Sequence, residues 1–145
     1  VLAMTTGPII ISHTNPRAFY DIERNSSDAH FKAVGERGGV IGVNAVLISD
    51  QKEEATLTRY VDHIEHIANI AGIDSVGVGF DFFKFIVDQW PPELQPKAGI
   101  HFPPDLFHHG HARNVTRLLI ERGFADDDIA KILYGNWLRI FQTLS

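Results

Sequence analysis

The chain contains no cysteine, so it can form no disulfide framework and offers no thiolate to a metal ion. Any metal site must therefore use imidazole, carboxylate or water as ligands. The lack of cysteine does not decide the cellular compartment, and we expect the cytoplasm.

Positive charge is also scarce. Thirteen Lys and Arg residues stand against 18 Asp and Glu residues, which gives a formal net charge of -5 and a pI near 5.9. A surface for nucleic acid or anionic lipid needs a cluster of basic residues, and the sequence has no such block. No apolar run approaches the roughly 20 residues that cross a bilayer. We therefore expect no nucleic-acid partner and no membrane-spanning segment.

The apolar content is sufficient for a hydrophobic core. Hydrophobic residues make up 44% of the 145 positions, a proportion typical of a folded domain and not of a disordered chain. Because no internal repeat or linker interrupts the sequence, we treat residues 1–145 as part of a single domain.

Three apolar segments are each followed by a polar side chain of a type that occurs in catalytic and ligand-binding sites. Residues 9–12 lead into His13, residues 40–43 lead into Asn44, and residues 75–80 lead into Asp81. Continuous apolar runs are typical of parallel strands that are buried on both faces. Since the carboxyl ends of parallel strands carry the functional groups of α/β folds, we expect these three side chains to meet at one rim.

Helical segments alternate with these strands. The spacing of apolar residues predicts helices over residues 28–36, 55–70, 104–122 and 126–143, and a long, proline-rich connection without regular structure over 82–103. Alternating strands and helices predict a parallel sheet with right-handed crossovers. Three parallel strands leave two open edges, so we expect part of a larger α/β unit.

Six ordered motifs resemble the C-terminal part of the membrane dipeptidase family, also called the M19 metallopeptidase family. Together they extend over nearly the whole chain, although each is weak alone. They are PIIISHTN at 8–15, RNSSD at 24–28, GGVIGVN at 38–44, DHIEHI at 62–67, VGVGFDF at 76–82 and GNWLR at 135–139.

This resemblance implies a fold, a reaction and site residues. The implied fold is the C-terminal portion of a TIM-type (β/α)8 barrel, and the implied reaction is hydrolysis of dipeptides by a hydroxide that bridges two zinc ions. His13 would bind one zinc, Asp81 would lie beside the bridging water, and Arg24 would face the substrate, with Asn44 on the same rim as a second substrate-binding residue. The remaining zinc ligands of the family would lie upstream of Val1.

The residue types suit that chemistry. Zinc accepts neutral imidazole and carboxylate ligands, and two zinc ions lower the pKa of a bridging water. A carboxylate can take a proton from water and later give it to a leaving amine. An arginine offers a charge-assisted fork to a substrate carboxylate or to a developing oxyanion.

Each site residue also has a purely structural interpretation. His13 could bond to backbone in its loop, Arg24 could pair with Asp21 or Glu23 at the surface, and Asp81 could be a turn residue. Other histidines are interpreted as structural from the start: His63 and His66 as packing and surface groups, and His108, His109 and His111 as residues on a helix surface.

Two other functions remain open. The protein could be a non-catalytic relative that serves binding or assembly, or an amidohydrolase with a similar barrel that acts on another amide or a lactam. The expected partners are a dipeptide or small amide, together with copies of the chain or the remainder of its own barrel. One histidine and one aspartate cannot hold a two-metal centre, so we expect the isolated chain to be largely inactive.

Overall fold

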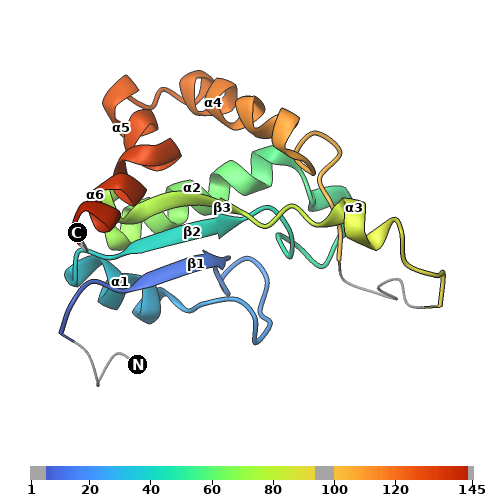
Figure 1. Cartoon of the computed structure of the whole chain (residues 1–145), viewed down its shortest axis with the longest axis horizontal. Helices are drawn as coiled ribbons and strands as arrows, with labels where there is room; N and C mark the ends of the chain where they lie inside the picture. Colours follow the sequence, from blue (N-terminus) through green and yellow to red (C-terminus); the bar gives the residue numbers. More distant parts are fainter. Residues whose placement is uncertain (1–5, 94–99, 144–145) are drawn as a thin grey trace.

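The computed structural model describes residues 6–93 and 100–143. Its centre is a three-stranded parallel sheet in the order β1 (Ile10–Thr14), β2 (Val40–Asn44) and β3 (Val76–Phe80), as Figure 1 shows. The register shifts near the carboxyl end of both strand pairs. The structure thus confirms the predicted α/β class and the parallel sheet.

Two helices follow the first two strands and form much of the core. They are α1 (Asp28–Glu36) and α2 (Leu57–Ala71), which pack on each other, and α2 also packs on the sheet. The helix boundaries follow from local chemistry, because Thr56 caps α2 by accepting a hydrogen bond from the Arg59 amide, and Gly72 ends it with a φ of 86°. The largest fully buried side chains include Phe31, Ile41, Tyr60, Ile64 and Ile67.

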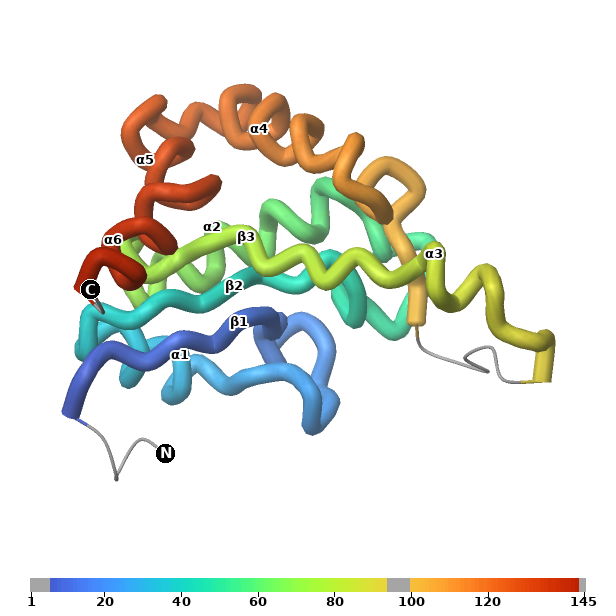
Figure 2. Tube along the Cα trace, viewed as in Figure 1, coloured from blue at the N-terminus to red at the C-terminus, as the bar shows by residue number. Residues whose placement is uncertain are grey.

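The C-terminal segment returns to the sheet as one nearly continuous helix. It consists of α5 (Asp126–Ala130), a π-helical turn at Lys131–Gly135 and α6 (Asn136–Gln142), which confirms the predicted helix over 126–143. Its path ends beside β2 and β3 at their amino-terminal ends (Figure 2). Asn136 anchors it there, since Nδ2 donates to the carbonyl oxygens of Ile73 and Val76, each at 2.8 Å.

Two predictions for residues 82–122 were wrong. The connection over 82–103 contains a short helix, α3 (Lys84–Val87), which is stabilised by an ion pair between Lys84 and Asp88 at 2.7 Å. The next helix, α4 (Ala112–Glu121), begins eight residues later than predicted, after a 3-10 turn at His109–His111 that His108 caps through its ring nitrogen. Residues 94–99 of the connection lie outside the described part.

Within residues 6–93 and 100–143, no helix combines the length and the apolar character that a bilayer crossing requires. In the same part of the chain, β1 and β3 each pair with a strand on one side only. The second finding agrees with the expectation that the sheet has two open edges.

Candidate active site

Three of the four predicted site residues meet at the carboxyl end of the sheet. His13 lies near the end of β1 and Asp81 follows β3, and His13 Nε2 is 3.6 Å from Asp81 Oδ2. Arg24, from the loop after β1, donates through Nη2 to the same His13 nitrogen. The side chains of His13 and Asp81 are 29% and 36% exposed, so solvent and small molecules can reach them.

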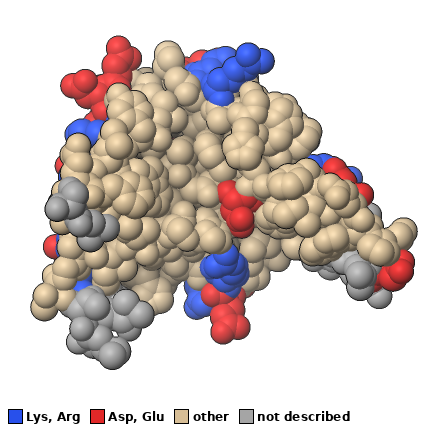
Figure 3. All heavy atoms as spheres, in the orientation of Figure 1, with Lys and Arg blue, Asp and Glu red and all other residues tan. Residues whose placement is uncertain are grey.

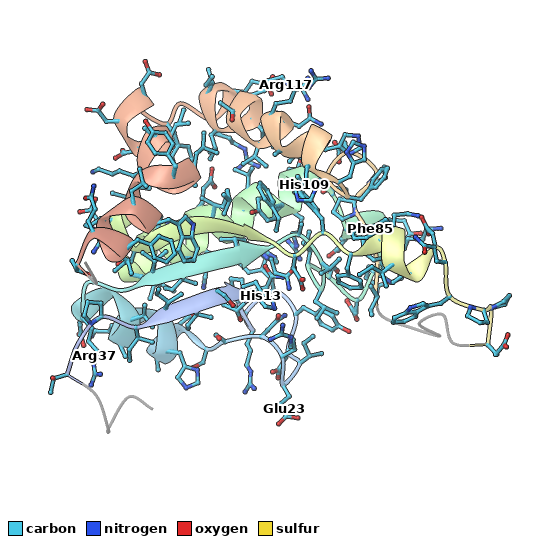
Figure 4. The ribbon with its side chains drawn as sticks, in the orientation of Figure 1. His13, Glu23, Arg37, Phe85, His109 and Arg117 are labelled. Atoms are coloured by element: carbon cyan, nitrogen blue, oxygen red, sulfur yellow. The ribbon has the colours of Figure 1, made fainter. Side chains whose placement is uncertain are left out.

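His13 lies near the middle of one face of the molecule (Figure 4). Figure 4 places His13 at the end of its strand, and Figure 3 shows a few acidic and basic side chains in the centre of a face that is otherwise mostly uncharged. Such an arrangement concentrates charge at one point of the rim, where a polar substrate would be attracted.

The hydrogen bonds of His13 define which nitrogen is available to a metal ion. The Arg24 guanidinium can only donate, so Nε2 accepts, and the proton sits on Nδ1, which lies 2.9 Å from Ser12 Oγ. The lone pair on Nε2 is the form of histidine that binds zinc. Together with the adjacent carboxylate, this donor set fits part of a zinc site.

The fit is partial. Nowhere in the part of the chain that the structure describes do three or more His, Asp or Glu side chains gather in a way that could hold a metal ion. A stable zinc site takes at least three protein ligands. His13 and Asp81 can therefore supply two groups toward such a site, and further ligands must come from elsewhere.

The backbone bends sharply where it presents Asp81. Phe80 and Asp81 have φ values of 28° and 60°, in the left-handed region that residues other than glycine rarely adopt. Aspartate tolerates this conformation better than most residues. The Phe80 carbonyl is held by the Ala45 amide at 2.8 Å, which fixes the bend against the end of β2. Local strain of this kind is common at functional sites.

Asn44 differs from the other three predicted site residues. Its side chain is 2% exposed, and Oδ1 accepts a hydrogen bond from the Val46 amide at 2.9 Å, so it stabilises the turn that follows β2. Its role in substrate binding remains a prediction.

A buried polar network beneath the rim was not predicted. Asn15, two residues after His13, donates through Nδ2 to the carbonyl oxygens of Val46 and Leu47 at 2.7 and 3.2 Å, and its Oδ1 lies 3.0 Å from Nδ1 of His63. In the sequence, Asn15 is marked only by its closeness to His13. Its hydrogen-bond partners are distant along the chain, so the sequence could not reveal the network.

His63 lies in the interior and His66 near the surface, as was expected. His63 is fully buried, and burial together with the positive charge of Arg59 lowers its pKa to about 3, so the ring is neutral. His66 is partly exposed and pairs with Asp28 at 2.8 Å, linking α2 to the start of α1.

The three histidines near α4 form aromatic contacts. The rings of His108 and His111 have centroids 3.7 Å apart, and both pack edge-on against Phe107. His109 packs edge-on against Phe82 at 5.2 Å. Among the described residues, these histidines belong to no group of three or more side chains that could hold a metal ion.

Two hollows of about 590 and 740 Å³ lie away from the rim. The first is lined by residues that include Glu65 and Arg122, and the second by residues that include Gly38, Gly72 and Lys131. The second hollow is at the amino-terminal end of the strands, opposite His13. The side chains of His13 and Asp81 at the rim are accessible to solvent.

A sequence model of the membrane dipeptidase family, peptidase family M19, matches residues 1–145. The chain belongs to this family. It is 34% identical to an uncharacterized dipeptidase of Schizosaccharomyces pombe, over 98% of this chain and 32% of the relative. It is 32% identical to an uncharacterized protein in the pqqA 5′ region of Klebsiella pneumoniae, over 96% of this chain and 48% of the relative.

Solved structures agree with this assignment. An amidohydrolase from Pseudomonas aeruginosa superposes with a TM-score of 0.78 at 26% identity, covering 96% of this chain and 46% of that one. The probable dipeptidase PvdM from the same organism superposes with a TM-score of 0.70 at 25% identity, covering 95% and 45%. The fold is therefore that of part of an M19-type α/β barrel, and the chain spans less than half the length of these relatives.

Proposed function

We propose that the protein is a zinc-dependent dipeptidase and that this chain supplies the C-terminal strands of its active site. The observation that carries the proposal is the meeting of His13, Arg24 and Asp81 at the carboxyl end of the sheet, in a chain of the M19 family. Dipeptidase names among the relatives support the same reaction.

We further propose that residues 1–145 form the C-terminal part of a single (β/α)8 barrel. The open edges of β1 and β3 would then pair with the other strands of that barrel. The coverage of the relatives, less than half of each solved chain, supports this arrangement. The other zinc ligands would come from those strands.

His13 Nε2 would hold one zinc ion, and Asp81 would stand beside the reacting water. Zinc, when bound as a pair of ions, supplies positive charge that polarises the peptide carbonyl and makes hydroxide available near neutral pH. The Arg24 contact with His13 Nε2 would have to open for the nitrogen to bind the metal, which would free the guanidinium for substrate.

The remaining roles follow from charge and position. A carboxylate oxygen of Asp81 would take a proton from the attacking water and pass it to the amine nitrogen as the peptide bond breaks. Arg24 would pair with the terminal carboxylate of the dipeptide, because a guanidinium forms two parallel hydrogen bonds with a carboxylate. Asn44 would stabilise the rim beneath the substrate by holding the turn that follows β2.

A second candidate is hydrolysis of a different small amide or a lactam. The similarity to the Pseudomonas amidohydrolase favours this candidate, since that structure has the higher of the two TM-scores given above. The same residues would act in the same way, and the two candidates differ only in what Arg24 binds.

The test measures hydrolysis of a panel of dipeptides, N-acyl amino acids and lactams by the protein as its gene encodes it, with bound zinc determined on the same sample. The proposal expects turnover of at least one dipeptide and zinc in the purified protein. Turnover of amides or lactams alone would favour the second candidate, and zinc-free protein without any turnover would contradict both.

A further inference from the structure

We infer that His63 is a positioning residue for the zinc and substrate groups at the rim, and that it acts through Asn15. This inference rests on the proposed function and extends it to a residue of α2 that lies outside the proposed set of site residues. The observation behind it is the hydrogen bond between His63 Nδ1 and Asn15 Oδ1 at 3.0 Å, inside the molecule.

The orientation of this pair follows from its surroundings. Asn15 Nδ2 faces two carbonyl oxygens, those of Val46 and Leu47, so Oδ1 must be the atom that faces His63. His63 therefore carries its proton on Nδ1 and donates it. The neutral ring that burial enforces is compatible with this role, because one nitrogen still has a proton to give.

Asn15 in turn fixes the turn after β2. Leu47 has a φ of 58°, in the left-handed region, and its carbonyl oxygen accepts hydrogen bonds from Asn15 at 3.2 Å and from Asn25 at 3.4 Å. Asn44 bonds the Val46 amide in the same turn. Three asparagine side chains thus hold one strained turn, and each lies within two residues of a proposed site residue or is one itself.

The same asparagine also joins the loops that carry the metal and substrate groups. The Asn15 carbonyl accepts from the Ser26 amide at 2.9 Å, and Thr14 Oγ1 lies 3.0 Å from Ser26 Oγ. Residues 13–16 and 24–26 are therefore tied to each other, and the Asn15 side chain ties them in turn to the segment after β2. Loss of the Asn15 side-chain orientation would loosen the loops that carry His13 and Arg24 from that segment.

His63 is placed to prevent that rotation. It comes from the middle of α2, whose ends are capped and whose apolar face lies in the core, so its ring is fixed relative to the sheet. The ring also packs against Phe19 with centroids 4.6 Å apart. Removal of a group that hydrogen-bonds to a metal ligand typically changes metal affinity or activity about 10- to 100-fold, and we take this range as the expectation for His63, which acts one step farther away through Asn15.

A competing explanation is that His63 only fills space in the core. The two explanations differ in what the residue must supply: a hydrogen-bond donor at one position, or only volume. Three substitutions separate them. His63→Asn keeps a donor close to the position of Nδ1, His63→Gln carries the same amide one carbon farther out, and His63→Leu keeps volume without any donor.

The experiment uses the protein as its gene encodes it, with zinc as the probe. Zinc affinity is measured by competition with a chromophoric chelator, kcat and KM are measured on the best dipeptide, and thermal unfolding verifies that each variant is folded at the assay temperature. We expect His63→Asn to stay within about threefold of the parent protein. We expect His63→Gln and His63→Leu to bind zinc about 10- to 100-fold more weakly and to lower kcat more than they raise KM.

Equal zinc affinity in the folded parent, His63→Gln and His63→Leu proteins would overturn the positioning role while leaving the proposed function intact. An equal loss in all three variants, including His63→Asn, would also overturn it, because packing alone explains that result. A parent protein that binds no zinc and hydrolyses no dipeptide would overturn the proposed function and the inference together.

Discussion

His13 Nε2 and Asp81 Oδ2 are 3.6 Å apart although His13 lies in one outer strand of the sheet and Asp81 directly follows the other. Two glycines make this proximity possible. A side chain on Gly42 or Gly79 would collide with the backbone of β1 at Ser12, and the two glycines also face each other across β2 and β3. The sheet can therefore curl until its outer strands approach at the rim.

This close approach predicts that Gly79→Ala is destabilising. The added Cβ would lie 2.6 Å from the Ser12 carbonyl oxygen and 2.8 Å from the Gly42 carbonyl carbon, and neither backbone group can move easily. We expect a loss of about 1–3 kcal/mol in the free energy of unfolding. Urea unfolding measures it, with Gly7→Ala as the control, because nothing lies within 4 Å of that position. An equally stable Gly79→Ala protein would contradict this explanation of the curl.

Arg24→Lys is expected to weaken substrate binding. Lysine keeps the charge and loses the planar fork that grips a carboxylate with two hydrogen bonds. KM for a dipeptide should rise about tenfold with a smaller change in kcat, as expected for an interaction made in both the ground state and the transition state. Steady-state kinetics provide the measurement, and Arg117→Lys on the far helix α4, labelled in Figure 4, is the control. An unchanged KM would argue that Arg24 serves only His13.

The buried His63 is expected to make the protein less stable at acidic pH. Its pKa is about 3 in the folded protein, mainly because of burial, and near 6.5 when the chain is unfolded. Between these values only the unfolded chain binds the proton, so stability falls as the pH drops from about 6.5 toward 3, by up to about 1.4 kcal/mol per pH unit. Above pH 6.5 this group contributes no pH dependence.

A comparison of the parent protein with His63→Asn separates the contribution of His63 to the pH dependence of stability from that of other titrating groups. Urea unfolding at pH 7 and pH 5 should show that the parent loses more stability on acidification than His63→Asn, because asparagine has no proton to gain. Parallel pH dependences in the two proteins would contradict the assigned pKa.

Much of the fold was predictable from local sequence. Residues 28–36 form the predicted helix to the residue, since its end is marked by Gly38, which adopts a φ of 65°. The strands were visible as apolar runs, and their polar ends located the rim where His13 and Asp81 meet. Parallel topology places both residues at the same rim, which the sequence was sufficient to predict.

Other features depend on contacts that no local pattern encodes. The first helical turn expected at residue 104 is absent because His108 caps a later start. The hydrogen bond between Asn15 and His63 joins residues on different elements, and the bend at Phe80 and Asp81 depends on the Ala45 amide. Each partner is distant in sequence, so the network beneath the rim becomes visible only once the fold is known.

The central claim is that His13 and Asp81 form part of one zinc-dependent hydrolytic site. The most direct measurement compares zinc content and dipeptide turnover in the protein as its gene encodes it with those of His13→Ala and Asp81→Asn. We expect His13→Ala to lose bound zinc and both variants to lose turnover by at least about 100-fold. Full turnover and full zinc content in both variants would contradict the claim.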